Sequence, residues 1–290
     1  MSTHNKPLAF VGAAFALGVA ITSAFGAPPA DGRSAADPQL VAAVQRYEAT
    51  KWAATAARAG LDLATVELPG LSGGTITRDA SGAMVRAWKD AHGVDRVLVE
   101  AATLDTVADA HERHVSTIAF VQTTITLPTT ASLGITAGDV GHVGRSGAGP
   151  GRISWIAFVR GNVHVRAVCL DPTVDPHPDM GVIAATIDRA ILAETPLAPG
   201  ARPAHPTIEH LTAASTECAA GKSVTLDLAA TDARLVEWSV GGAGQGYVER
   251  DSTDGAWKFH ATGVGKVEVA VVVSSPRGTS TGASVAIDVR

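Results

Sequence analysis

Cysteine and aromatic residues are scarce in this sequence, and positively charged residues do not outnumber negatively charged ones. Two cysteines in 290 residues exclude a disulfide-dense mini-protein and a zinc or iron–sulfur site built from cysteines. The formal net charge is −5, which argues against a nucleic-acid-binding protein because such proteins present a basic face to phosphates. The sequence also lacks a phosphate-binding loop that ends in Gly-Lys-Ser/Thr and the dinucleotide-binding glycine fingerprint. Apolar residues, by contrast, make up 46% of the chain and are ample for globular cores.

The first 26 residues have the three regions of a secretory signal peptide. Residues 1–6 are polar, residues 8–21 are nearly all apolar, and small residues follow. Cleavage before Ala27 would place Ala24 and Gly26 at the −3 and −1 positions. An uncleaved anchor is the alternative, because the apolar stretch approaches the roughly 20 residues of a membrane-spanning helix. We expect an exported protein, periplasmic, cell-surface or extracellular, with no stable membrane span once the signal peptide is removed.

Residues 37–193 predict an α+β domain. Apolar residues at helical spacing predict helices over 37–60, 104–120 and 179–193. Two successive units of strand, strand and helix predict an antiparallel sheet with helices packed on one face. Gly161-Asn162 lies between two strongly apolar runs and predicts a hairpin. The expected strands are 74–78, 83–89, 96–101, 142–146, 153–160 and 162–170.

A proline-rich linker, residues 194–206, separates this domain from an all-β segment. Four prolines and a glycine make the linker incompatible with a helix or a central strand. Residues 207–290 contain short alternating strands punctuated by turn residues, which indicate a β-sandwich. Residues 241–246 are glycine-rich and predict a loop at its edge. The expected strands are 208–213, 223–229, 235–240, 257–261, 267–274 and 283–289.

The C-terminal segment resembles a known group of modules. Val-Glu-Trp-Ser-Val at 236–240, the pair Gly241-Gly242 and Trp-Lys-Phe-His-Ala-Thr at 257–262 are similar to bacterial immunoglobulin-like domains of the PKD-like and Big-like type. This resemblance covers residues 207–290 and implies a spacer, an adhesion module, or a contact with carbohydrate or protein. The segment with Gly138-Asp139 and Gly161-Asn162-Val163 resembles exported bacterial domains of unknown function. That second resemblance implies no catalytic residues.

Two groups of residues are weak candidates for a metal site. His111 and His114 lie three residues apart on an expected helix and could share one metal, but His111 also falls on the apolar stripe, and the competing interpretation places the pair at the edge of a core. Asp175, His177 and Asp179 alternate on a proline-stiffened loop and could face one cation. The competing interpretation makes Asp179 the N-cap of the last helix. We assign no metal, cofactor or catalytic residue, and in both groups the structural interpretation is favoured.

The favoured function is that of a non-enzymatic exported envelope protein. Its 37–193 domain would bind an envelope protein, a glycan or a small ligand, and the 207–290 module would act as spacer or contact. A hydrolase-like envelope enzyme is the first alternative, for which Asp139, His142 and Ser146 would have to converge on a pocket. The run 144–148 nearly matches the nucleophile elbow Gly-x-Ser-x-Gly, but its last residue is alanine. A purely structural protein is the second alternative.

The two cysteines are expected to remain free thiols. Cys169 alternates in phase with Val163, Val165 and Ala167 and should face the apolar side of a sheet. Cys218 lies in a polar turn that leads into the sandwich. A bridge between them stays open as an alternative, because export favours oxidation. Because aromatic residues are so few, core positions are favoured for Trp155 and Trp238, whereas Trp88 and Trp257 stay open between a core position and an exposed ring that could stack on a sugar.

Overall fold

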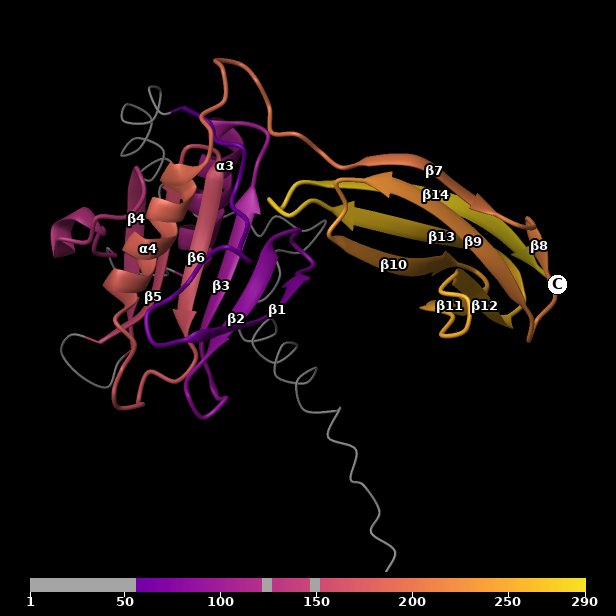
Figure 1. The fold of residues 1–290 in the computed structure, drawn as a ribbon, viewed down its shortest axis with the longest axis horizontal. Coiled ribbons are helices and arrows are strands. Elements are labelled where there is room, and N and C mark those ends of the chain that lie inside the picture. The colour runs from indigo at the N-terminus through magenta and orange to yellow at the C-terminus, as the bar shows by residue number, and fades with distance from the viewer. Residues whose placement is uncertain (1–55, 122–126, 147–151) are drawn as a thin grey trace, which may run out of the picture.

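The structure is a computed structural model that describes residues 56–121, 127–146 and 152–290 (Figure 1). The expected signal peptide and most of the helix expected over 37–60 lie outside the described residues. Residues 56–60 are described and are not helical. Arg58 instead forms a β-bridge with Pro196, and the Leu197 amide donates to the Ala57 carbonyl at 2.8 Å. The prediction of a helix over 37–60 is therefore wrong for residues 56–60, because their backbone pairs with the segment that follows residue 193.

The N-terminal part, residues 56–193, is built on one six-stranded antiparallel sheet in the order β1-β2-β3-β6-β5-β4. Residues 160 and 163 pair across Gly161-Asn162, so the predicted two-residue hairpin is confirmed. A short 3-10 helix, η1 (Ala131–Leu133), precedes β4. The strands are β1 (Ser72–Arg78), β2 (Met84–Lys89), β3 (Asp95–Thr103), β4 (Val140–Arg145), β5 (Ile153–Arg160) and β6 (Val163–Cys169).

Two helices pack on opposite faces of this sheet. α4 (Met180–Ala193) packs on the face that carries Phe158, whereas Ala110 of α3 (Val107–Val121) packs with Val159. Phe158 and Val159 are neighbours on β5, and neighbouring side chains on a strand point to opposite faces. The prediction of helices on one face is therefore wrong. Residues 156–159 are all buried, as expected of a strand covered on both faces.

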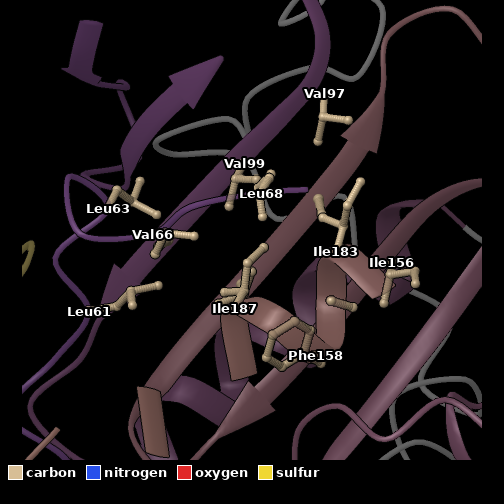
Figure 2. Close-up of a cluster of buried hydrophobic side chains, with 14 of the residues drawn as sticks. Leu61, Leu63, Val66, Leu68, Val97, Val99, Ile156, Phe158, Ile183 and Ile187 are labelled. Atoms are coloured by element: carbon tan, nitrogen blue, oxygen red, sulfur yellow. The ribbon is translucent and has the colours of Figure 1, made fainter. Parts of the chain in front are cut away.

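The main core lies between the sheet and α4 (Figure 2). Ile183 and Ile187 of the helix face Phe158 and Val99 of the sheet, and residues 61–68 close one side of this layer. The apolar residues that recur at helical spacing along α4 are all buried: Met180, Ile183, Ala184, Ile187 and Ile191. The second face has a much smaller apolar cluster, in which Ala110, Val140 and Val159 are the buried members.

The C-terminal part, residues 207–290, consists of two four-stranded sheets that share one core. The sheet orders are β10-β13-β14-β8 and β11-β12-β9-β7, and Phe259 of one sheet packs with Val269 of the other. All six expected strands are present. β11 contradicts the loop expected over 241–246, because Gly246 pairs with Ala261. The strands are β7 (Thr207–Ala213), β8 (Glu217–Cys218), β9 (Ser223–Thr231), β10 (Leu235–Gly242), β11 (Gln245–Arg250), β12 (Trp257–Gly263), β13 (Gly265–Ser274) and β14 (Ser280–Val289).

The two parts touch at a joint that brings together residues far apart in the sequence. Arg234 pairs with Asp62 at 2.7 Å, and Arg277 pairs with Glu194 at 3.0 Å. The Thr103 hydroxyl donates to the Arg277 carbonyl at 2.5 Å. Leu235 adds an apolar contact, since it packs against the main core of the N-terminal part. The sandwich thus contacts the sheet at several points besides the covalent connection.

Both cysteines are free and buried. Cys169 belongs to the main core, as its alternation predicts, whereas Cys218 belongs to the sandwich core instead of a polar turn. The reason is that β8, which contains Cys218, pairs with β14. Burial also raises the pKa of the Cys169 thiol.

We expect neither thiol to react quickly with a disulfide reagent in the native protein. Two thiols should be titrated after unfolding in urea, and the native rates should be at least about tenfold slower because local opening must come first. Mass spectrometry of unreduced protein supplies the complementary measurement. A peptide that links Cys169 to Cys218 would contradict the prediction.

Candidate functional site

A pocket of about 530 Å³ lies at one end of the six-stranded sheet. Three chain segments enclose it: the loop at 69–71, the β2–β3 turn at 90–92, and residues 174–183, which run from a loop into α4. Arg96, near the start of β3, completes the lining. Apolar groups form most of the wall, namely Pro69, Leu71, Val174, Pro176, Pro178, Val182 and Ile183.

The polar part of the wall is held rigidly by the β2–β3 turn. The Asp90 carboxylate accepts hydrogen bonds from the amides of His92 and Val94 at 2.8 and 3.0 Å, and from the Arg96 Nε at 2.7 Å. The hydrogen bond from the Val94 amide is the largest cause that lowers the pKa of Asp90; desolvation opposes it, and the hydrogen bond from Arg96 lowers the pKa further. Asp90 and Arg96 therefore face the pocket as a fixed ion pair.

The three loop residues singled out as weak metal candidates all line this pocket. Asp179 is the N-cap of α4, as predicted, because its carboxylate accepts from the Val182 amide at 3.0 Å. The Asp175 side chain is 88% exposed and lies 3.9 Å from Arg152. The Nε2 atom of His177 is buried without a hydrogen-bond partner in the structure. Within the described ranges, no three carboxylates, imidazoles or thiols are placed to hold a metal ion.

The second pair of candidates belongs to a buried histidine cluster, which we define as His111, His114, His142 and His164. His114 is fully buried on the sheet side of α3, and its Nε2 lies 3.0 Å from the Nδ1 of His142 on β4. The ring centroids of His114 and His164, on β6, are 5.6 Å apart. The structure thus places His114 in the interior, whereas His111 is only half-buried at its side. The predicted position at the edge of a core holds for His111 but understates the burial of His114.

The surroundings of the histidine cluster favour neutral imidazoles. Burial lowers the pKa of His111 and of His142 to about 4, and that of His164 to about 3. Burial, followed by the neighbouring histidines, also lowers the pKa of His114 well below its ordinary value. Two ring nitrogens, His114 Nδ1 and His164 Nε2, are buried without a hydrogen-bond partner in the structure. A proton added here would have to occupy a site shielded from water.

Sequence reasoning missed His164 and the grouping of the four histidines. His142 and His164 lie on different strands, and β5 separates these strands in the sheet. A signal was nevertheless present, because His142 alternates in phase with the buried Val140 and is therefore a polar residue at an inward position. Only the strand order shows that His164 points to the same face, opposite His114.

The three residues required by a hydrolase do not form a common site. Asp139 accepts from Arg160 at 2.5 Å and from the Gly161 amide at 2.8 Å. His142 contacts His114 in the histidine cluster. Both side chains are therefore engaged with other partners. The linings of the pocket at the end of the sheet and of a second pocket, at the start of α3, include neither of them nor Ser146.

No family model matches the chain, and a search of the curated proteins finds no match. In the part of the chain that the structure describes, no helix is long and apolar enough to cross a membrane. A fold by itself does not determine a function, so the function has to be argued from the pocket and its lining.

Proposed function

We propose that this protein is a non-enzymatic binding protein exported to the bacterial envelope, with its ligand site in the pocket at the end of the N-terminal sheet. The observation that carries the proposal is the pocket itself, a concave site of about 530 Å³ with mostly apolar walls and a few fixed polar groups. Such a combination is typical of small-molecule sites in proteins. Export is inferred from the signal-peptide pattern of residues 1–26.

The pocket suits a small ligand with an apolar body and one polar group. Prolines, valines and Ile183 would cover the apolar body. A polar ligand atom that reaches the Nε2 of His177 would give this buried nitrogen the hydrogen bond that it lacks in the structure. The Asp90–Arg96 pair would orient the ligand without needing to move, because the turn already fixes it.

The C-terminal sandwich is proposed to be an immunoglobulin-like module of the PKD-like or Big-like type that serves as a spacer or as a contact. Two four-stranded sheets around a shared core support this assignment. A purely structural role for the whole chain is less favoured, because such a role would need no concave site with an unpartnered buried nitrogen.

The test uses 1-aminoanthracene, a neutral apolar probe, in isothermal titration calorimetry. We expect saturable binding to one site with a Kd on the order of 10 μM, a value reasonable for a small apolar molecule in a preformed pocket. The variant Val182→Trp should weaken binding at least about tenfold, because Val182 lines the pocket and a larger side chain would fill it.

A matched control comes from the same helix. Leu192 is 41% exposed and Val182 is 44% exposed, but only Val182 belongs to the pocket lining. Leu192→Trp should therefore bind the probe as the natural protein does. Absence of saturable binding, or an equal loss in both variants, would contradict a ligand site in this pocket.

A further inference from the structure

The helices α3 and α4 are held on the sheet by different kinds of side chain. α4 is held by the large main core, whereas the apolar cluster beneath the described part of α3 has three buried members, Ala110, Val140 and Val159, and Ile118 of α3 is buried besides. Imidazole rings are buried between α3 and the sheet as well. His114 faces His142 and His164 there, and these three side chains are at most 9% exposed.

We propose that the histidine cluster is an acid-sensitive latch that holds α3 on the sheet at neutral pH and releases it in mild acid. The geometry provides one hydrogen bond between His114 and His142, and this bond needs one ring nitrogen to donate and the other to accept. If both rings are protonated, both nitrogens become donors and the bond is lost. The charged rings would then repel each other inside a region shielded from water.

The charged groups around the cluster offer little compensation for added protons. α3 contributes Arg113, β6 contributes Arg166, and β3 contributes Glu100, which lies 3.5 Å from Arg166. Asp79, in the turn after β1, faces Glu100 and Arg113. The two arginines therefore already balance the two carboxylates when all four histidines are neutral. Burial raises the pKa of Glu100, so this carboxylate would itself tend to lose its charge on acidification.

The direction of the pH effect follows from the histidine pKa values. In the released state the rings are hydrated and have a pKa near 6.5. In the closed state the pKa of His142 is about 4 and that of His164 about 3. The released state consequently binds more protons as the pH falls below about 6.5, and closure of α3 weakens through that range. Between pH 7 and pH 5 each such histidine favours release by about 20-fold, so these two together favour it by several hundred-fold.

The test is hydrogen exchange of the full chain at pH 7 and pH 5, read by mass spectrometry on peptides from α3 and α4 and corrected for intrinsic exchange rates. Protection of α3 should be lower than that of α4 at both pH values and should fall several hundred-fold from pH 7 to pH 5. If α3 and α4 share the same protection at each pH, the opening is global and the latch is wrong. A fall of less than about tenfold in α3 would also overturn it.

Two variants separate the latch from a general effect of acid. His142→Asn keeps a polar atom near the position of Nδ1 but does not titrate, so the pH-dependent loss of α3 protection should shrink by about 20-fold. His164→Leu removes another titrating ring and replaces it with an apolar side chain. The pH-dependent loss of α3 protection should shrink to a similar extent in this variant. His92→Asn, which changes an exposed histidine of the β2–β3 turn, should leave the pH-dependent loss of α3 protection unchanged. An undiminished pH dependence in both cluster variants would overturn the proposal.

Discussion

Replacement of Arg160 by methionine is expected to lower the free energy of unfolding of the N-terminal part by about 3–5 kcal/mol. The Arg160 guanidinium binds the Asp188 carboxylate through two hydrogen bonds, of 2.8 and 2.7 Å, and binds Asp139 through a third. The Asp188 side chain is only 3% exposed. Methionine retains the apolar stem but leaves a buried carboxylate without its cation, and this loss dominates the effect.

Scanning calorimetry of the full chain would measure this loss as a fall of about 10 °C in the melting temperature of the N-terminal transition. Arg152→Met is the matched control, because Arg152 is exposed and its nearest carboxylate lies 3.9 Å away; it should cost no more than about 0.5 kcal/mol. The double variant Arg160→Met with Asp188→Leu should recover part of the loss, since it removes the unpaired charge on α4. Equal melting temperatures for Arg160→Met and Arg152→Met would contradict the prediction.

The second large effect concerns the sandwich, where Phe259→Ala is expected to cost about 3–5 kcal/mol. The Phe259 side chain is fully buried in the shared core of the two sheets. The site cannot easily collapse, because Gly246 on the neighbouring strand already lies against the ring and has no side chain to move into the space. Val264→Ala, at a position 66% exposed, should change stability by less than about 0.5 kcal/mol.

The same variant tests whether the two parts of the chain unfold independently. Calorimetry of Phe259→Ala should show the sandwich transition moved to lower temperature and the N-terminal transition nearly in place. The joint should transmit only a small fraction of the loss, because its ion pairs join exposed arginines to half-buried carboxylates and are partly screened by solvent. A common shift of both transitions would contradict independent unfolding and would make the joint the dominant coupling between the parts.

Local signals in the sequence predicted α4 and the β5–β6 hairpin well. α4 has an N-cap, Asp179, and a regular apolar stripe, and both features act within a few residues of each other. The hairpin has a glycine at 161, which adopts a positive φ of 56°. Asn162 shows what such signals omit: its side-chain oxygen accepts from the Arg58 amide, and its amide nitrogen donates to the Leu104 carbonyl. Partners so far away along the chain leave no local pattern.

The errors arose where distant segments decide the outcome. The strand β11 was not predicted, and its first two residues fell in the loop expected over 241–246 because of the glycines there. Gly246 nevertheless lies under the ring of Phe259, where a side chain would not fit. Similarly, Trp155 was expected in a core but is half-buried over Gly144, whereas Trp238 packs against the sandwich core as predicted. The histidine cluster could not be assembled from sequence, because its members become neighbours only through the order of the strands.

The joint and the pocket lie at opposite ends of the same two elements. β3 begins beside Arg96 of the pocket and ends at Thr103 of the joint, and α4 runs from Asp179 to the residue before Glu194. At about 3.3 Å per residue, β3 separates the two by roughly 23 Å. If the sandwich serves as the proposed spacer, it carries the pocket at the end of the N-terminal part that is farther from the joint. A neighbour that binds the sandwich would then leave the mouth of the pocket open.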